Sequence, residues 1–237
     1  MMTDNNKGMN VKKFTLFAGM CFCSSLFAAQ GDQTLSVGFA QMNSDGLKSV
    51  FDTMAREVNL NSQADASAFG APVRANYDGY SAPRGGFIRY RYEVTNQWGL
   101  ITAATYATED GAAHYQASKS SGKADKDYLY GKGRVTGDYV SLMAGPTYRI
   151  NDFLSLYAMT GASYQKFHSE FSSSEYRNDN LMSRRSTSSG ESNYSIAWSL
   201  GGQVNVYKGL VVDASYEGSG RGKFKTNGFT VGLGYKF

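Results

Sequence analysis

The chain has 237 residues, of which 41% are hydrophobic and 19% are charged, and its formal net charge is only +4. This charge is too small to predict nucleic-acid binding, and the mean hydropathy of −0.41 is too polar for a bundle of transmembrane helices. Tyrosine, phenylalanine and glycine are abundant, with 17, 14 and 27 residues, whereas proline occurs 3 times. This composition is typical of β structure.

The first predicted element is an export signal. An apolar run, residues 14–29, follows two lysines and ends in two alanines, which is the layout of a secretory signal peptide. A short buried helix is the alternative for this run. We predict a cleaved signal over residues 1–29 and a single domain over residues 30–237. Both cysteines lie in the signal, so the mature chain is expected to lack disulfides, zinc–thiolate sites and cysteine catalysis.

Eight segments of the mature domain alternate between large apolar side chains and small or polar ones. A period of two is typical of a β-strand whose two faces meet different surroundings. Pro146 does not fit, because proline cannot donate to a β-ladder, and we predict a local bulge or bend there. The eight segments are residues 34–42, 86–94, 98–106, 139–150, 154–164, 194–206, 210–217 and 227–237.

The connections between these segments alternate strictly between short and long. An up-and-down barrel has short turns at one rim and long loops at the other, and in a transmembrane barrel the long loops face outside. We therefore predict an all-β fold, an eight-stranded antiparallel up-and-down transmembrane β-barrel with four long extracellular loops and three short periplasmic turns. The short links are residues 95–97, 151–152 and 207–209, and the long ones are roughly 43–85, 107–138, 167–192 and 218–227.

The second face of the strands indicates what this barrel contains. Charged residues recur on that face, and eight strands leave an interior just wide enough for side chains. Because their signs are mixed, we predict a packed ion-pair network and not a conducting pore, with the apolar face toward lipid. A soluble lipocalin-like barrel or a β-sandwich is the alternative. The predicted interior set is Arg89, Arg91, Glu93, Asp213, Glu217 and Lys236.

The first long connection contains a helical pattern within residues 46–60. Its apolar residues recur at the spacing of one helix face. We predict either a short amphipathic helix that caps the barrel, contacts lipopolysaccharide or meets a host protein, or a mobile loop with accidental periodicity. The apolar residues are Leu47, Val50, Phe51, Met54 and Val58.

Several separated blocks of the chain are recognisable together. They are SVGFAQ (36–41), GGFIRYRYEVTNQWGLI (85–101), GPTYRINDFLSLY (145–157), VVDASYE (211–217) and VGLGYKF (231–237). These blocks resemble one family of outer-membrane proteins, the Ail/Lom/OmpX family, over most strands and all the short turns, and the resemblance includes Pro146. It implies an eight-stranded barrel in a Gram-negative outer membrane, with attachment, invasion or serum resistance exerted through extracellular loops.

The resemblance also implies partners. These are lipopolysaccharide, the outer-membrane assembly machinery, and host extracellular-matrix or complement-regulatory proteins. Phe237 resembles the terminal aromatic signal that the assembly machinery reads. We expect a monomer with no cofactor and no nucleic acid. The alternative function is a structural barrel that contacts lipopolysaccharide and has no host-binding role.

Two basic stretches in the long connections supply candidate binding residues. They could bind phosphates of lipopolysaccharide or sulfated glycans through charge-assisted hydrogen bonds, and a plain solvated surface is the alternative. Four aromatic residues could be exposed anchors for a protein partner, or could mark the outer lipid interface. The basic candidates are Arg184, Arg185, Arg221, Lys223 and Lys225, and the aromatic ones are Phe167, Phe171, Tyr128 and Tyr130.

Enzymatic activity is the rival function class. It needs a base and a nucleophile within hydrogen-bond reach of each other. The chain has only two histidines, His114 and His168, and they lie in different connections. His168 is followed by Ser169 and Glu170, but adjacency in the sequence is weak support for a site. We therefore predict no catalytic, metal or cofactor site.

Overall fold

The computed structural model describes residues 30–120, 126–178 and 180–237, so the expected signal peptide, residues 1–29, lies outside the described residues. Within these ranges the chain forms strands, one long helix and a 3-10 turn. The elements are β1 (Gln33–Ser44), α1 (Asp45–Phe69), β2 (Arg74–Tyr77), β3 (Arg84–Glu93), β4 (Trp98–Ser120), β5 (Lys126–Arg149), β6 (Leu154–Arg177), β7 (Asn180–Tyr207), β8 (Leu210–Ser219), η1 (Gly222–Phe224) and β9 (Thr226–Lys236).

Eight of these strands form a closed antiparallel ring, which confirms the predicted up-and-down barrel. Strands that follow one another around the chain pair with each other, and β1 closes the ring by pairing with β9 from Thr34–Lys236 to Ser44–Thr226. The short β2 stands outside the ring and pairs with β4. Closure gives the backbone groups of the barrel partners within the sheet, as a membrane requires.

The period of two separates the interior of the barrel from its outer surface. Val37, Ile88 and Leu142 point outward with exposed fractions of 54%, 45% and 67%, whereas Arg89 and Asp213 point inward and are fully buried. This is the reverse of a soluble barrel, and it matches an apolar surface that faces lipid. Within the described residues, no helix is both long enough and apolar enough to cross a membrane.

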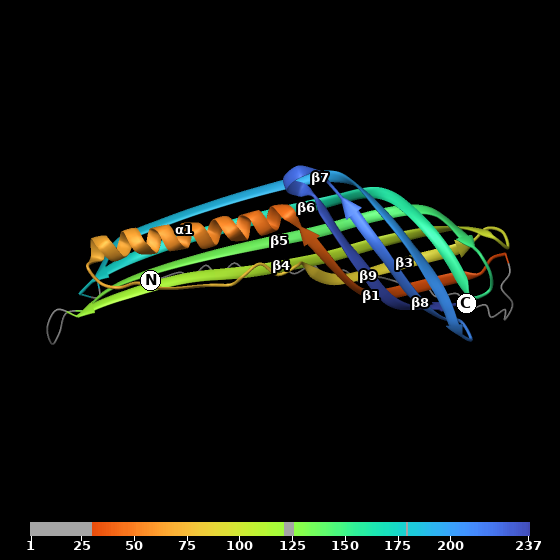
Figure 1. Ribbon diagram of the computed structural model, residues 1–237, viewed down its shortest axis with the longest axis horizontal. Helices are drawn as coiled ribbons and strands as arrows, with labels where there is room; N and C mark the ends of the chain where they lie inside the picture. Colours follow the sequence, from red (N-terminus) through yellow and green to blue (C-terminus); the bar gives the residue numbers. More distant parts are fainter. Residues whose placement is uncertain (1–29, 121–125, 179) are drawn as a thin grey trace, which may run out of the picture.

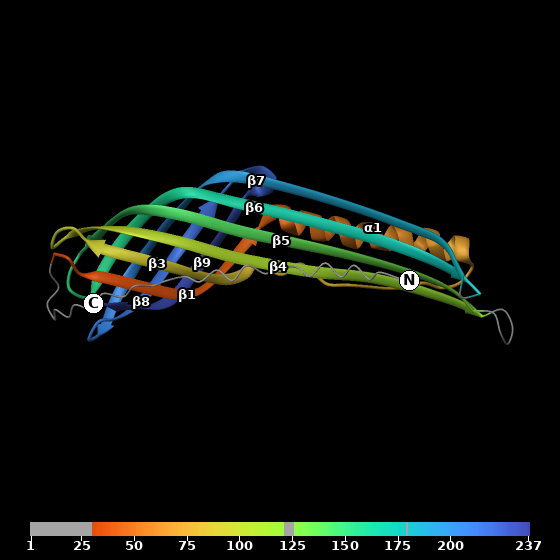
Figure 2. The same cartoon turned by 180° about the vertical axis from the view of Figure 1, so that it is seen from behind.

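Four strands, β4 to β7, continue well beyond the ring (Figures 1 and 2). They have 23 to 28 residues, against 10 to 12 for the other ring strands. Much of the connections predicted at 107–138 and 167–192 is therefore paired β-sheet, which corrects the expectation of long loops there. We call this part the extension; it comprises residues 109–120, 126–137, 167–177 and 180–191.

Of the two alternatives for the connection from β1 to β3, the structure contains the helix, and this helix is longer than the stretch 46–60. The Ser44 hydroxyl accepts a hydrogen bond from the Leu47 backbone N–H and caps the first turn. The helix ends at Gly70, whose left-handed φ of 69° terminates it as glycine commonly does. Figure 1 shows α1 lying along the extension.

Pro146 does not cause the predicted bulge. It pairs with Leu100 of β4, while the ladder between β5 and β6 skips Gly145 and Pro146. Pairing resumes at Thr147–Tyr157 in the same register as before the gap. The missing proline N–H therefore interrupts one ladder locally without shifting the strand, because the other ladder holds its position.

Candidate functional site

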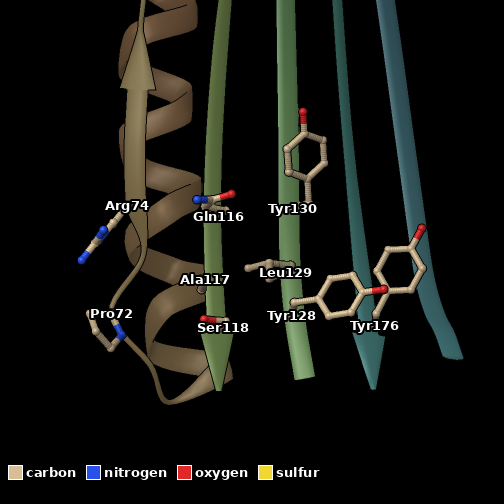
Figure 3. Close-up of a pocket in the computed structure, with 9 residues that line it drawn as sticks. All are labelled: Pro72, Arg74, Gln116, Ala117, Ser118, Tyr128, Leu129, Tyr130 and Tyr176. Carbon is tan, nitrogen blue, oxygen red and sulfur yellow. The ribbon is translucent and has the colours of Figure 1, made fainter. Parts of the chain in front are cut away.

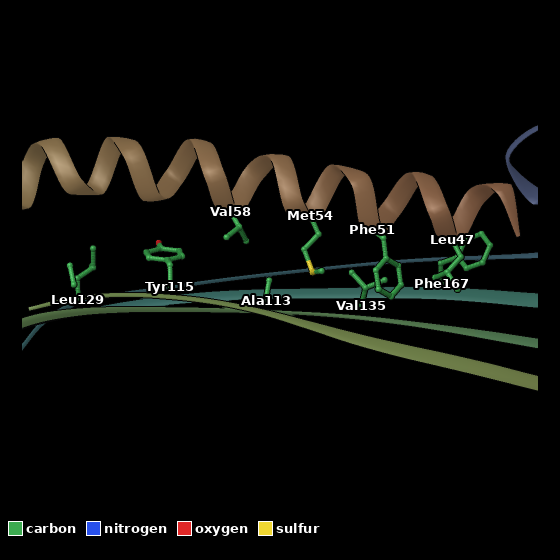
Figure 4. Close-up of a cluster of buried hydrophobic side chains, with 10 residues drawn as sticks. Leu47, Phe51, Met54, Val58, Ala113, Tyr115, Leu129, Val135 and Phe167 are labelled. Carbon is green, nitrogen blue, oxygen red and sulfur yellow. The ribbon is translucent and has the colours of Figure 1, made fainter. Parts of the chain in front are cut away.

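The extension is covered on one face by helix α1 (Figure 4). Leu47, Phe51, Met54 and Val58 project from the helix onto the sheet and are at most 8% exposed. Two glycines make room for them: a Cβ at Gly111 would lie 2.2 Å from the Phe51 ring, and one at Gly137 would lie 2.6 Å from Leu47. We call the buried set under α1 the helix cluster; its sheet members are Ala113, Tyr115, Ala117, Leu129, Val135 and Phe167.

Polar contacts hold both ends of the helix, one to the connection between β2 and β3 and one to the sheet. At its start, the Ser44 backbone N–H donates to the Tyr80 hydroxyl at 3.0 Å. Nearer its end, the Tyr115 hydroxyl donates to an Asp65 carboxylate oxygen at 2.7 Å. Burial, and then the Asp65 carboxylate, raise the pKa of Tyr115, so the phenol stays protonated and keeps donating. The helix is thus a fixed part of the extracellular surface.

Phe167 and Phe171 are not exposed anchors, which corrects the expectation for both. Phe167 is 6% exposed, belongs to the helix cluster and stacks on Phe224 with ring centroids 5.6 Å apart. Phe171 packs against the same cluster and stacks on Tyr115 at 6.3 Å. Phe167 is buried and Phe171 is partly buried, because α1 covers the face of the sheet from which both rings project.

One long edge of the extension is open. Strand β7 pairs with β6 from Asn180 to Val204, but β8 pairs with β7 only from Ala197 onward. We call residues 180–190 of β7 the β7 edge; along it, pairing within the described residues is with β6 alone. Its described side chains are exposed, including Arg184 and Arg185, which project to opposite faces because they are consecutive. Backbone donors and acceptors on such an edge are available to a partner.

The second basic stretch lies elsewhere. Lys223 lies in the turn η1 and Arg221 and Lys225 flank it, next to the start of α1. Lys223 forms an ion pair with Glu191 at 2.7 Å, so its charge is partly neutralised. Glu191 and Arg184 lie on the same strand, β7, and at about 3.3 Å per residue they are roughly 23 Å apart. The two basic stretches therefore do not form one site.

The barrel interior contains the charged residues that the alternation predicted to lie there. Arg89 pairs with Asp213, and its other Nη donates to the Ser215 hydroxyl at 3.0 Å. Glu217 is separate from these pairs: it accepts hydrogen bonds from the hydroxyls of Thr105, Tyr139 and Ser141, at 3.1, 2.7 and 2.5 Å. Its carboxylate is thus solvated by hydroxyl groups.

A second interior group lies near the short turns. Arg91 and Arg149 both contact Glu93, at 3.1 and 3.2 Å. Asp32 lies 3.4 Å from Arg149 and 3.4 Å from Lys236. The sequence-based set omitted Arg149 and Asp32. Arg149 is the last residue of β5 and Asp32 comes just before β1, and both fall on the inward-facing positions of the alternation. Extending the two-residue alternation to the strand ends would therefore have predicted both residues.

The histidines do not form a catalytic arrangement with the neighbouring serine. His168 Nε2 lies 3.1 Å from a Glu170 carboxylate oxygen on the same strand, and both side chains are exposed. Ser169 projects to the opposite face of β6, because it is the intervening residue. His114 lies on β4, where it pairs with Lys132 of β5.

A family model described as the enterobacterial Ail/Lom protein matches residues 58–237. The chain belongs to this family. The match begins within α1, so the first half of the helix lies outside it. The predicted family, fold and outer-membrane location of this Ail/Lom protein are therefore confirmed.

Known relatives of this Ail/Lom protein carry names that refer to virulence and attachment. The outer membrane protein lom of Escherichia phage lambda is 36% identical over 67% of this chain and 76% of its own length. The virulence membrane protein PagC of Salmonella typhimurium is 32% identical over 79% of this chain and 95% of its own. The attachment invasion locus protein of Yersinia pseudotuberculosis is 32% identical over 96% and 98%. This Ail/Lom protein thus belongs with outer-membrane proteins of the adhesion and virulence type.

A solved structure supports the same assignment for this Ail/Lom protein. The crystal structure of Ail, the attachment invasion locus protein of Yersinia pestis, is 26% identical and covers 88% of this chain and 99% of its own, with a TM-score of 0.50. That Ail has also been crystallised with the heparin analogue sucrose octasulfate.

Proposed function

We propose that this outer-membrane protein attaches to polyanions outside the cell through the β7 edge, with sulfated glycans of the extracellular matrix as the main ligands. The observation that carries the proposal is the open edge itself, with Arg184 and Arg185 exposed on it. Arginine presents several N–H donors in a planar fork, which fits sulfate and phosphate groups. Complement-regulatory proteins that carry anionic patches could use the same edge.

The surroundings of the two arginines favour anion binding. The stretch 183–190 contains serine, threonine and glycine beside the arginines, and no acid. Among the described residues, the ion pairs do not involve Arg184 or Arg185, so both guanidinium groups are available. Hydroxyl groups at this density can donate further hydrogen bonds to sulfate oxygens. The phosphates of lipopolysaccharide offer the same chemistry, and they are the ligand of the alternative, purely structural function.

The double variant Arg184→Ser/Arg185→Ser should bind heparin at least tenfold more weakly, a loss of about 1.4 kcal/mol, because two charge-assisted contacts disappear. Binding is measured by surface plasmon resonance with the protein in lipid nanodiscs. The double variant Lys48→Ser/Arg56→Ser is the control, because it removes the same charge from the exposed side of α1. An equal loss in this control, or no loss in the β7 variant, would contradict the proposal.

A further inference from the structure

A cavity of about 820 Å³ lies at the far end of the extension (Figure 3). It is lined by residues from four chain segments, which come from β4, β5, β6 and the stretch around β2. This volume is within the range of small-molecule sites in proteins. The lining is a mixture of rings and polar groups, chiefly Arg74, Gln116, Ser118, Tyr128, Tyr130 and Tyr176.

The strand register places these side chains on one face of the sheet. Gln116 pairs with both Arg74 of β2 and Tyr130 of β5, which gives one cross-strand row. In the next row, Tyr128 pairs with Ser118 of β4 and with Tyr176 of β6. Because directly opposed residues share a face, the two rows lie on the face opposite α1.

The helix cluster supports this surface from the other side. Ala117 and Leu129 alternate with the exposed residues, and they are only 5% and 7% exposed beneath α1. The strands under the cavity are therefore fixed by packing on their other face. A binding surface held in this way loses little conformational freedom when a ligand arrives.

The tyrosines form an aromatic surface without an evident structural purpose. Tyr128 and Tyr176 stack with centroids 4.6 Å apart and an interplanar angle of 18°, and Tyr130 is 43% exposed. Tyr128 lies roughly 45 Å along β5 from Leu142, at about 3.3 Å per residue. Leu142 is on the outward apolar face of the barrel. The three tyrosines are therefore too far along the strand to serve as interfacial residues of the membrane.

Stacked tyrosines beside polar side chains are suited to a sugar ring. The face of an aromatic ring carries partial negative charge, and it attracts the weakly positive C–H groups on the face of a pyranose. The Gln116 amide, the Ser118 hydroxyl and the phenol hydroxyls can pair with sugar hydroxyls. A flat, hydroxyl-rich ligand therefore fits this cavity better than an apolar peptide segment does.

Arg74 adds a preference for negative charge. Its side chain is exposed, and within the described residues it takes part in none of the ion pairs. A guanidinium group matches a carboxylate with two parallel hydrogen bonds. Among the described residues that line the cavity, Arg74 is the one cation, and a single guanidinium group favours a sugar with one carboxylate over a densely sulfated chain.

We propose that this cavity binds an acidic, unsulfated glycan from outside the cell, with a pyranose ring stacked on Tyr128 and a carboxylate bound by Arg74. The ligand class is that of uronate- or sialate-containing glycans. The residues differ from those of the β7 edge, so the two sites can be tested separately.

The test measures binding of a hyaluronan hexasaccharide and of a sialic-acid oligomer to the full chain in nanodiscs by isothermal titration calorimetry. At least one of these two glycans should bind. Tyr128→Ala should weaken its binding at least tenfold, whereas Tyr128→Phe, which keeps the ring, should retain it. Arg74→Gln should reduce the affinity to that of a neutral chitin hexasaccharide. Tyr77→Ala is the control, because Tyr77 is also exposed, at 52%, but does not line the cavity.

The outcomes separate this proposal from the first one. Arg184→Ser/Arg185→Ser should lose heparin binding but keep the acidic glycan, and Tyr128→Ala should do the reverse. The proposal is overturned if neither acidic glycan binds, if Tyr128→Ala binds as tightly as the unchanged chain, or if the neutral glycan binds equally well. Tighter binding of the lipopolysaccharide core oligosaccharide would also overturn it, because the ligand would then belong to the cell's own envelope.

Discussion

Replacing Phe51 by alanine should detach helix α1 from the extension while the barrel stays folded. The Phe51 ring is 2% exposed, fills the space over Gly111 and makes an edge contact with Tyr80 at 5.8 Å. Removing a buried phenylalanine side chain costs about 3–5 kcal/mol. Most of the stability of a helix in a protein comes from the packing of its apolar face, so α1 depends on this packing.

Amide hydrogen exchange measures this effect directly. Protection of the amides in α1 should fall by roughly two to four orders of magnitude, while the ring strands keep theirs. Thr53→Ala is the matched control, because Thr53 is exposed on the same helix. A surface change of this kind usually stays within about 0.5 kcal/mol. Full protection of α1 in Phe51→Ala would show that the helix cluster does not hold the helix.

Replacing Asp213 by alanine should destabilise the barrel itself. Asp213 and Arg89 are both fully buried and form an ion pair. Asp213 also accepts hydrogen bonds from the Tyr157 hydroxyl at 2.8 Å and from the Gln203 amide at 2.6 Å. Without the carboxylate, the Arg89 charge is left buried and uncompensated, at a cost of about 3–5 kcal/mol.

Urea unfolding in lipid vesicles measures this loss, with Asp152→Ala as the control. Asp152 lies in a short turn between β5 and β6 and is exposed. The double variant Arg89→Met/Asp213→Leu should recover most of the stability, because an apolar pair leaves no unpaired charge. Unfolding of Asp213→Ala at the same urea concentration as the unchanged chain would show that the buried ion pair of Arg89 and Asp213 does not stabilise the barrel.

The barrel could be predicted from the sequence because lipid and interior impose opposite demands on alternate residues. Along β1, Val37 and Phe39 face outward while Ser36 is fully buried. The extension shows no comparable alternation of apolar and polar residues, because one of its faces is exposed to water. Both arginines of the β7 edge are likewise exposed. Its other face is apolar only under α1, where small residues such as Ala113 are sufficient.

The candidate site was harder to predict, because burial depends on distant segments. Phe167 lies in a polar stretch of the sequence, which predicts an exposed ring. In the structure it is covered by α1 and by Phe224, which come from two other connections. The cross-strand row that joins Arg74 to Tyr130 requires β2, a strand of four residues without an apolar pattern. The ion pair of Asp32 with Arg149 links chain segments that meet only when the ring closes.

The central claim is that the extension is responsible for attachment, whereas the barrel only anchors the extension in the membrane. A trimmed chain tests this claim; it lacks residues 46–79, 112–134 and 170–188, and short turns close the three gaps. The cuts in the strands fall beside the directly paired residues Gly111–Val135 and Ser169–Ser189, so the register of the ring is kept. Heat-modifiable gel mobility first establishes that the full and trimmed chains are folded in equal amounts in the outer membrane.

The measurement is adherence to cultured epithelial cells by non-adherent bacteria that express either chain. Bacteria with the full chain should adhere, and bacteria with the trimmed chain should adhere no better than bacteria with an empty vector. Equal adherence with both chains would contradict the account, because attachment would then not depend on the extension.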